Sequence, residues 1–247
     1  MSGAAAKRRG VLEPTIFAIA GIAVLIGLGI WQLDRKVWKE NLIDTVTARL
    51  SQAPQALPAR VDWPKLVAGD SEYRRVAFPA EFLPGEEALV YTAGSNFRPD
   101  VQGPGYWVFA PVRLAGGSLV MVDRGFIPYD RKDKATRSPL PRGIVDIVGV
   151  MRWPETRGLF TPADEPNNNL WYLRDPAAIA AAHKWSVAAP FYIEQESPAP
   201  PDGLPKPGKL VAALPDNHLQ YALTWFGLAL GLAGVYIAWM TRRIAGR

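Results

Sequence analysis

The chain contains no cysteine and only two histidines among its 247 residues. Without cysteine there can be no disulfide framework, no Cys-x-x-Cys redox pair, no thiolate-bound copper or zinc, and no Cys-x-x-Cys-His attachment of haem. Two histidines and four methionines are too few for a catalytic metal centre built from several imidazoles. Any folded domain must therefore be held together by its own apolar core.

Sequence motifs of common catalytic sites are also missing. The chain has no Gly-x-Ser-x-Gly elbow, no Gly-rich nucleotide loop and no His-Glu-x-x-His pair. Asp164 and Glu165 could act as an acid–base pair, but prolines flank them and adjacent side chains usually point in different directions, which favours a solvated turn. We therefore expect a protein that is not an enzyme, with a membrane-anchored periplasmic enzyme as an alternative.

Charged residues are absent from two long apolar runs, Pro14–Leu33 and Leu219–Thr241. Each run is about as long as the roughly 20 residues that a helix needs to cross the hydrocarbon core of a bilayer. Both are predicted to be transmembrane helices. The predicted organisation is a cytoplasmic tail at 1–13, transmembrane helix 1 at 14–33, a juxtamembrane helix at 34–50, a periplasmic α+β domain at 51–217, transmembrane helix 2 at 218–241 and a cytoplasmic tail at 242–247.

Basic residues lie before the first run and after the second. Lys7, Arg8 and Arg9 precede the first run, and the last six residues include three arginines, Arg247 among them. The positive-inside rule therefore places both tails in the cytoplasm. The first run is too long for a cleaved signal peptide and leaves little room for a mitochondrial presequence. We expect a multi-pass protein of a bacterial inner membrane, with a twin-arginine export signal at Arg8 and Arg9 as the alternative.

The region between the two runs is electrically neutral. Six of the 28 basic residues and one of the 23 acidic residues lie outside Asp34–His218, which leaves 22 residues of each sign within it. A nucleic-acid-binding domain would concentrate positive charge on the surface that contacts phosphate. The basic isoelectric point therefore reflects membrane topology, and no nucleic acid is expected as a partner.

Short alternating segments separated by turn residues dominate the central region. They predict strands followed by one helix, which opens with Asp175 as N-cap and runs to about Trp185. Proline-rich segments at Ser51–Pro64 and Ser197–Gly208 are predicted to be linkers. Together these features predict a mainly antiparallel β domain, of α+β class and barrel- or sandwich-like, between the two transmembrane helices. The predicted strands are 73–82, 88–95, 106–114, 118–126 and 145–153.

Topology brings two groups of residues to the outer membrane interface, because the first run leaves the membrane where the second enters it. Helical spacing places Trp31, Arg35 and Trp38 on one face, and His218, Tyr221 and Trp225 on another. Small residues at Gly227 and Gly231 would allow the helices to approach closely. An imidazole, aromatic walls and a cation suit a haem. Interfacial aromatic belts occur without cofactors, however, and His218 could instead help to cap its helix after Asp216. The other histidine, His183, is expected to lie on the domain surface.

Seven blocks along the chain resemble, in order, those of the Surfeit locus protein 1 family, whose members are assembly factors for haem-copper cytochrome c oxidase. The resemblance departs from the family pattern at Asp123, where Asn is usual. It implies that the protein helps to build the oxidase, that haem a is its cargo, and that the histidine at the start of the second run is the haem ligand. The blocks are 28–39, 73–76, 105–111, 120–128, 155–162, 169–175 and 217–227.

The resulting hypothesis is that His218 ligates the haem iron while Arg35 or Lys39 pairs with a propionate. The catalytic subunit of the oxidase and haem a synthase are the expected protein partners, and the lipid bilayer is the expected surroundings of the helices. Residues 124–126 and 152–171 are expected to be exposed and to contact these partners. The alternative is a haem-free scaffold that stabilises an early oxidase subunit and does not need His218. The full set of predicted haem-binding residues is His218, Trp31, Gln32, Arg35, Trp38, Tyr221 and Trp225.

Overall fold

The structure is a computed structural model that describes residues 2–213 and 215–245, with side chains from Gly10 onward. Arg247 and the side chains of Lys7, Arg8 and Arg9 thus lie outside the described residues. The chain forms two compact units. One contains the residues up to Asp44 together with those from Pro215 onward, and the other is Thr45–Leu214.

Two long helices occupy the ends of the chain, as the apolar runs predict. Helix α1 spans Ser2–Ser51 and α4 spans His218–Ala245. Both are long and apolar enough to cross a membrane, with mean hydropathies of 2.3 and 1.6 in their most apolar windows. Helix α1 runs without a break through the predicted transmembrane and juxtamembrane segments and ends three residues before Pro54, which cannot continue a helix.

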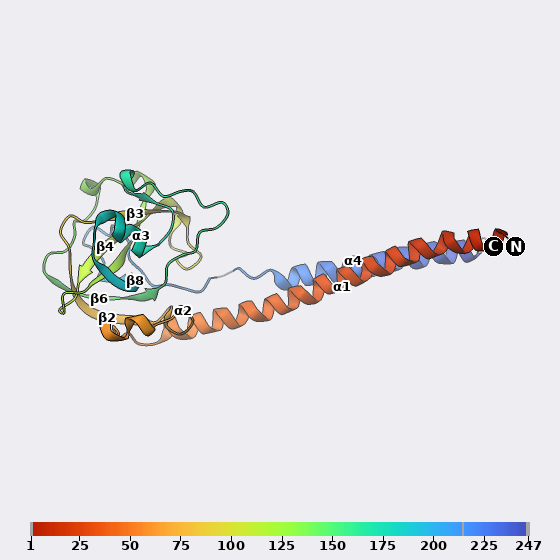
Figure 1. The fold of residues 1–247 in the computed structure, drawn as a ribbon, viewed down its shortest axis with the longest axis horizontal. Coiled ribbons are helices and arrows are strands. Elements are labelled where there is room, and N and C mark those ends of the chain that lie inside the picture. The colour runs from red at the N-terminus through yellow and green to blue at the C-terminus, as the bar shows by residue number, and fades with distance from the viewer. Residues whose placement is uncertain (1, 214, 246–247) are drawn as a thin grey trace. The chain divides into compact units, whose positions relative to one another are not determined.

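Within the first unit, α1 and α4 lie side by side and run antiparallel (Figure 1). A hydrogen bond of 2.7 Å joins the hydroxyl group of Thr15, in the N-terminal half of α1, to that of Tyr236, in the C-terminal half of α4. Alternating spacings of four and three residues are typical of helices that pack along one continuous seam. Buried and half-buried positions with this spacing include 11, 15, 18, 22, 25, 29, 32 and 36 in α1 and 218, 222, 225, 229, 232 and 236 in α4.

Close approach between the helices occurs at glycines of α1 rather than at those predicted in α4. A Cβ atom added to Gly29 would overlap the ring of Phe226, and one added to Gly21 would press on Leu232. Gly227 and Gly231 have open space on that side, so the prediction that they form the contact is wrong. Both lie outside the seam positions of α4. The spacing of small residues alone does not show which face of the helix forms the seam.

The central unit is built around a closed ring of strands. The hydrogen-bonded order is β1-β2-β6-β8-β5-β4-β3-β7, and a further pairing of β2 with β4 closes the ring β2-β6-β8-β5-β4. This arrangement confirms a barrel-like domain between two apolar helices. The strands are β1 Gln55–Ala56, β2 Arg75–Phe82, β3 Ala88–Gly94, β4 Gln102–Arg113, β5 Leu119–Pro128, β6 Ile144–Arg152, β7 Leu170–Trp171 and β8 Val187–Ser197.

The sheet is mixed, because of strands that the sequence did not predict. Among the described strands, five of the eight pairings are antiparallel, whereas β1–β2, β3–β7 and β5–β8 are parallel. Strand β8 follows α3 (Pro176–His183) and returns between β5 and β6, so the expectation that all strands precede the helix is wrong. The shorter helical segments are α2 (Ala68–Ser71) and 3-10 turns at Arg60–Lys65, Tyr129–Arg131, Lys134–Thr136 and Pro166–Asn168.

Both proline-rich segments pack against the barrel, so neither is a free linker. Trp63 from the first is buried in the core, and its ring meets that of Phe191 edge to face with centroids 5.6 Å apart. In the second, Lys206 exchanges two backbone hydrogen bonds with Phe126 of β5, at 3.0 and 2.7 Å. The predicted cap of α3 is confirmed: the Asp175 carboxylate accepts the backbone N–H groups of the second and third helical residues.

Candidate functional site

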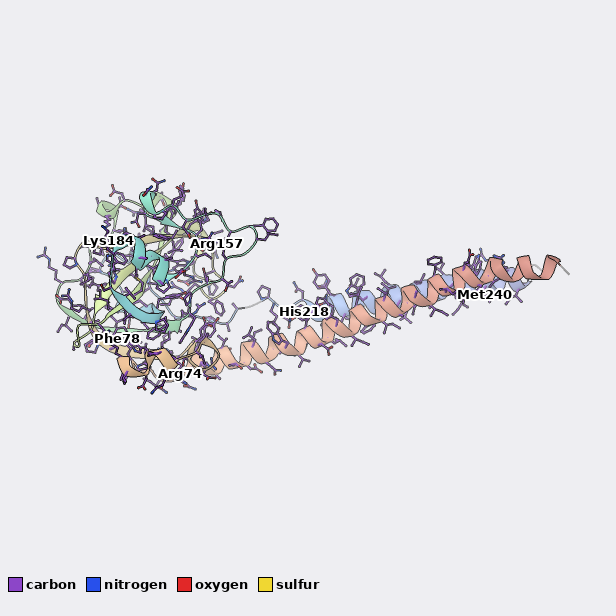
Figure 2. The ribbon with its side chains drawn as sticks, in the orientation of Figure 1. Arg74, Phe78, Arg157, Lys184, His218 and Met240 are labelled. Carbon is purple, nitrogen blue, oxygen red and sulfur yellow. The ribbon has the colours of Figure 1, made fainter. Side chains whose placement is uncertain are left out.

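Gln32 of α1 and His218 of α4 meet at one end of the seam. His218 is the first residue of α4 (Figure 2). Its Nδ1 lies 2.7 Å from Oε1 of Gln32. Both side chains are half-buried, and both positions belong to the series spaced by four and three. The same spacing that packs the two helices therefore brings these two predicted site residues together.

This contact fixes the protonation pattern of the imidazole ring. An amide oxygen can only accept a hydrogen bond, so Nδ1 of His218 carries the hydrogen and donates it to Gln32. The lone pair of a neutral imidazole then resides on Nε2. Within the described part of the chain, Nε2 makes no hydrogen bond. An imidazole whose other nitrogen is held by a hydrogen-bond acceptor is the usual arrangement of a metal-ligating histidine.

His218 is not the residue that caps α4. The carboxylate of Asp216 accepts the backbone N–H of His218 at 3.0 Å, and the carbonyl of Asn217 accepts the N–H of Tyr221 at 3.1 Å. The side chain of Asp216 thus satisfies the first backbone N–H of α4. The imidazole of His218 is left to contact Gln32.

The aromatic residues predicted around the imidazole lie on the outer surface of the helix pair. Trp31, Trp38 and Tyr221 are each slightly more than half exposed, whereas Trp225 is half-buried. The guanidinium of Arg35 lies over the Trp38 ring, 4.1 Å from its centroid. Among the described residues, the hydrogen-bond partner of the imidazole is Gln32, while the aromatic side chains offer an open apolar surface on the same two helices.

Cations are available beside this surface. Lys39 donates a hydrogen bond to the carbonyl of Pro215, while Lys36 pairs with Glu40. The donor set fits a haem bound at one face: a single imidazole nitrogen for iron, indole rings for the macrocycle and guanidinium or ammonium groups for propionates. His218 would hold the iron, and Arg35 or Lys39 would hold a carboxylate.

The second histidine is placed differently. His183, in the last turn of α3, stacks on Trp185 with ring centroids 4.3 Å apart, and its Nε2 lies 3.2 Å from the amide oxygen of Asn169. Burial lowers the pKa of His183 from its ordinary value. It is half-buried, and it packs within the domain, so it differs from His218 in having its Nε2 engaged.

Four of the residues predicted to contact partner proteins are internal. Arg124, Phe126, Arg152 and Trp171 are all buried, so the prediction that they are exposed is wrong. The first three of these residues lie in β5 and β6, which belong to the closed ring, and Trp171 lies in β7.

The middle of the predicted range, residues 154–168, is mostly exposed, and its most exposed part is a turn. There, Leu159 and Phe160 are 91% and 92% exposed. Arg157, labelled in Figure 2, fixes this turn by bonding to the carbonyl of Pro162 and the carboxylate of Asp164. Two large apolar side chains at the tip of a fixed turn are unusual, since turns favour small and polar residues.

A buried ionic cluster inside the domain was missed by the sequence analysis. Glu194 of β8 accepts hydrogen bonds from Arg152 and Arg174, at 3.0 and 3.4 Å. Asp123 of β5 lies opposite Glu194 in the β5–β8 pairing, and neither is exposed by more than 1%. Burial and the nearby charge of Glu194 raise the pKa of Asp123 to about 8. The available signal was the occurrence of Asp, Arg and Glu within otherwise apolar strands. Charged residues are normally paired when they are buried.

Comparisons with known proteins place the sequence in one family. The model of the SURF1 family matches residues 19–230. A SURF1-like protein of Monosiga brevicollis is 33% identical over 234 residues, covering 92% of this chain and 86% of that protein. Surfeit locus protein 1 of Homo sapiens is 31% identical over 232 residues, covering 89% and 74%, and that of Rattus norvegicus is 30% identical over 235 residues, covering 91% and 74%. The match includes both Gln32 and His218 and extends across the barrel, and the chain belongs to the SURF1 family.

Proposed function

We propose that this protein is an assembly factor for haem-copper cytochrome c oxidase, which binds haem a at the outer membrane interface and delivers it to the catalytic subunit. The observation that carries the proposal is the hydrogen bond from His218 to Gln32, because it leaves Nε2 of the imidazole free for iron. Membership of the SURF1 family supports a role in oxidase assembly. The protein would act by binding and release, without a catalytic turnover of its own.

The residues around His218 are suited to hold a cargo that must later leave. Gln32 orients the imidazole, and the exposed indoles of Trp31 and Trp38 offer apolar surface without enclosing the ligand. Haem a, when bound, would supply a redox-active iron, which His218 would hold. An open site of this kind favours transfer of the haem to a partner, since less contact area is lost on release than from an enclosed site.

The proposed setting is a bacterial inner membrane. The basic residues beside the outer ends of both apolar runs support cytoplasmic tails and a periplasmic barrel. Haem a synthase is the proposed donor of the cargo and the catalytic subunit of the oxidase its acceptor. In this arrangement His218, at the start of α4, would lie where the second helix enters the membrane.

Complementation of cells that lack the protein tests this proposal. Wild-type protein and the variants His218→Ala, Gln32→Leu and His183→Ala are produced at equal levels, and the haem a content of the assembled oxidase is measured in membranes. We expect the wild type and His183→Ala to restore the haem a content fully. Gln32→Leu should restore it in part, and His218→Ala should not restore it. Full restoration by His218→Ala would refute the haem-handling role.

One observation favours the alternative of a haem-free scaffold. The fixed turn that presents Leu159 and Phe160 has the exposed apolar character of a binding hot spot. If the scaffold is correct, Leu159→Ser and Phe160→Ser would abolish oxidase assembly while His218→Ala would not. The two candidate functions are thus separated by the same complementation assay.

A further inference from the structure

A second charged cluster lies on the barrel, and Arg124, which follows Asp123 in β5, belongs to it. Its centre is the carboxylate of Glu87, which is 5% exposed. Arg124 donates to it at 2.5 Å and Arg137 at 3.0 Å, and the Lys134 ammonium lies 3.6 Å away. Three cations thus share one buried carboxylate.

The cluster has more buried positive charge than buried negative charge. The side chains of Arg124 and Arg137 are only 4% and 2% exposed, and a buried cation without its own counter-ion is costly. Arg137 donates to Glu87 through one terminal nitrogen, and its buried Nε has no hydrogen-bond partner among the described residues. Burial also lowers the pKa of Arg124. The cluster is therefore short of an acceptor anion.

A hollow of about 390 Å³ opens beside these cations. Lys134, Arg137 and Arg142 contribute positive charge to its wall. Glu87 and the exposed Glu81 contribute negative charge. Lys134 is held in place by the carbonyl of Gly85, to which it donates at 2.9 Å. The cationic groups thus border a space of a size typical of small-molecule sites.

A neighbouring hollow of about 610 Å³ has a largely apolar lining. The segment from Ser138 to Pro141 and the ring of Phe82 line both hollows, and several prolines and Val145 line the second alone. Its charged groups are Arg124 and the exposed Asp202. The two hollows together are cationic at one end and apolar at the other.

We propose that these hollows form a binding site for an amphipathic anion, in which a carboxylate or phosphate group meets Lys134, Arg137 and Arg142 and an apolar body lies against Phe82 and the prolines. The bound oxyanion supplies the acceptor that the Glu87 cluster lacks. Guanidinium groups pair with carboxylate and phosphate through charge-assisted hydrogen bonds. This site is formed by the central unit alone and does not depend on the haem-handling role of His218.

Calorimetric titration of the full-length protein in a neutral detergent tests the site. The probes are 2-naphthoate and 2-naphthyl phosphate, with the uncharged 2-naphthamide as control for the apolar body. We expect one saturable site for at least one of the two anions. The amide should bind at least about tenfold more weakly, since one charge-assisted hydrogen bond is worth about that factor. The relative affinities of the two anions show which oxyanion the site prefers.

Matched variants locate the binding. Lys134→Gln and Arg142→Gln remove cations from the wall without disturbing the buried guanidinium groups, and each should weaken binding of the preferred anion by about tenfold. Lys209→Gln, which changes an exposed lysine that lines neither hollow, should leave it unchanged. Equal binding of the amide, equal loss in all three variants, or no saturable binding of either anion would each overturn the proposal.

Discussion

The buried carboxylate of Asp123 makes a strong prediction about stability. One of its oxygens accepts the backbone N–H of Gly125 at 3.0 Å, while the other has no hydrogen-bond partner in the described residues. One carboxylate oxygen of Glu194, in the neighbouring strand, is also without a partner. The substitution Asp123→Asn would keep the first contact and place an N–H donor where the unpaired oxygen now lies. It would also remove a titrating charge from the core.

The magnitude follows from the pKa of Asp123, which is raised from 3.8 to about 8. The folded state holds a proton that the unfolded state releases once the pH exceeds about 4, so the free energy of unfolding falls as the pH rises from about 4 to about 8. Each pH unit in this window costs about 1.4 kcal/mol. At pH 7 the wild type therefore loses about 4 kcal/mol relative to its stability at pH 4 from this group, and Asp123→Asn should recover most of that loss.

The assay is denaturant unfolding of the full-length protein in detergent, followed by tryptophan fluorescence between pH 5 and pH 8. The wild-type curve should move to lower denaturant as the pH rises, and the Asp123→Asn curve should move much less. Asp146→Asn, which changes an exposed carboxylate of β6, should retain the wild-type dependence. A variant that is less stable than wild type at pH 7, or a wild type whose stability does not fall over this range, would refute the reasoning.

Three further predictions can be tested by thermal unfolding monitored by circular dichroism. Gly125 has a φ of +122° and a backbone carbonyl where its Cβ would lie. Gly125→Ala should therefore lower the free energy of unfolding by about 2–4 kcal/mol. Gly116→Ala, in open space, should change it by less than about 0.5 kcal/mol. Asp175→Ala should cost about 1 kcal/mol by removing the cap of α3, and an unchanged midpoint would contradict that role. Gly29→Ala should be less stable than Gly27→Ala by about 1–3 kcal/mol, because only the former meets a phenyl ring of α4.

The features that the sequence predicts well are those set by local chemistry. Both terminal helices follow from the absence of charge over a membrane-length run, and the start of α3 follows from Asp175 followed by proline. Five strands were found because turn residues separate alternating segments. In each case the physical signal lies within a few neighbouring residues.

The features that were missed depend on residues distant in the sequence. Strand β8 has Glu194 and Gln195 at buried positions, and their burial makes sense only when Arg152 and Arg174 are known to lie beside them. Trp63 lies among prolines, which suggested a linker, yet it packs in the core. Similarly, which glycines allow α1 and α4 to approach depends on the rotation of each helix about its axis, and that is fixed by the whole seam.

The candidate site shows the same division. Topology predicted that Gln32, at the end of the first run, would lie near His218, and the structure places them in direct contact. The sequence could not predict that Gln32 would hold Nδ1 and leave Nε2 free, because this depends on side-chain geometry at the seam. It also could not predict that Asp216 caps α4 in place of the histidine.

The most direct test of the central claim is the absorption spectrum of the detergent-purified protein, produced together with the enzymes of haem a synthesis. The account predicts a haem a spectrum for the wild type and for His183→Ala, and its loss in a folded His218→Ala variant. A colourless wild type, or a His218→Ala protein that retains haem in the same amount with an unchanged spectrum, would contradict the assignment of His218 as the haem ligand.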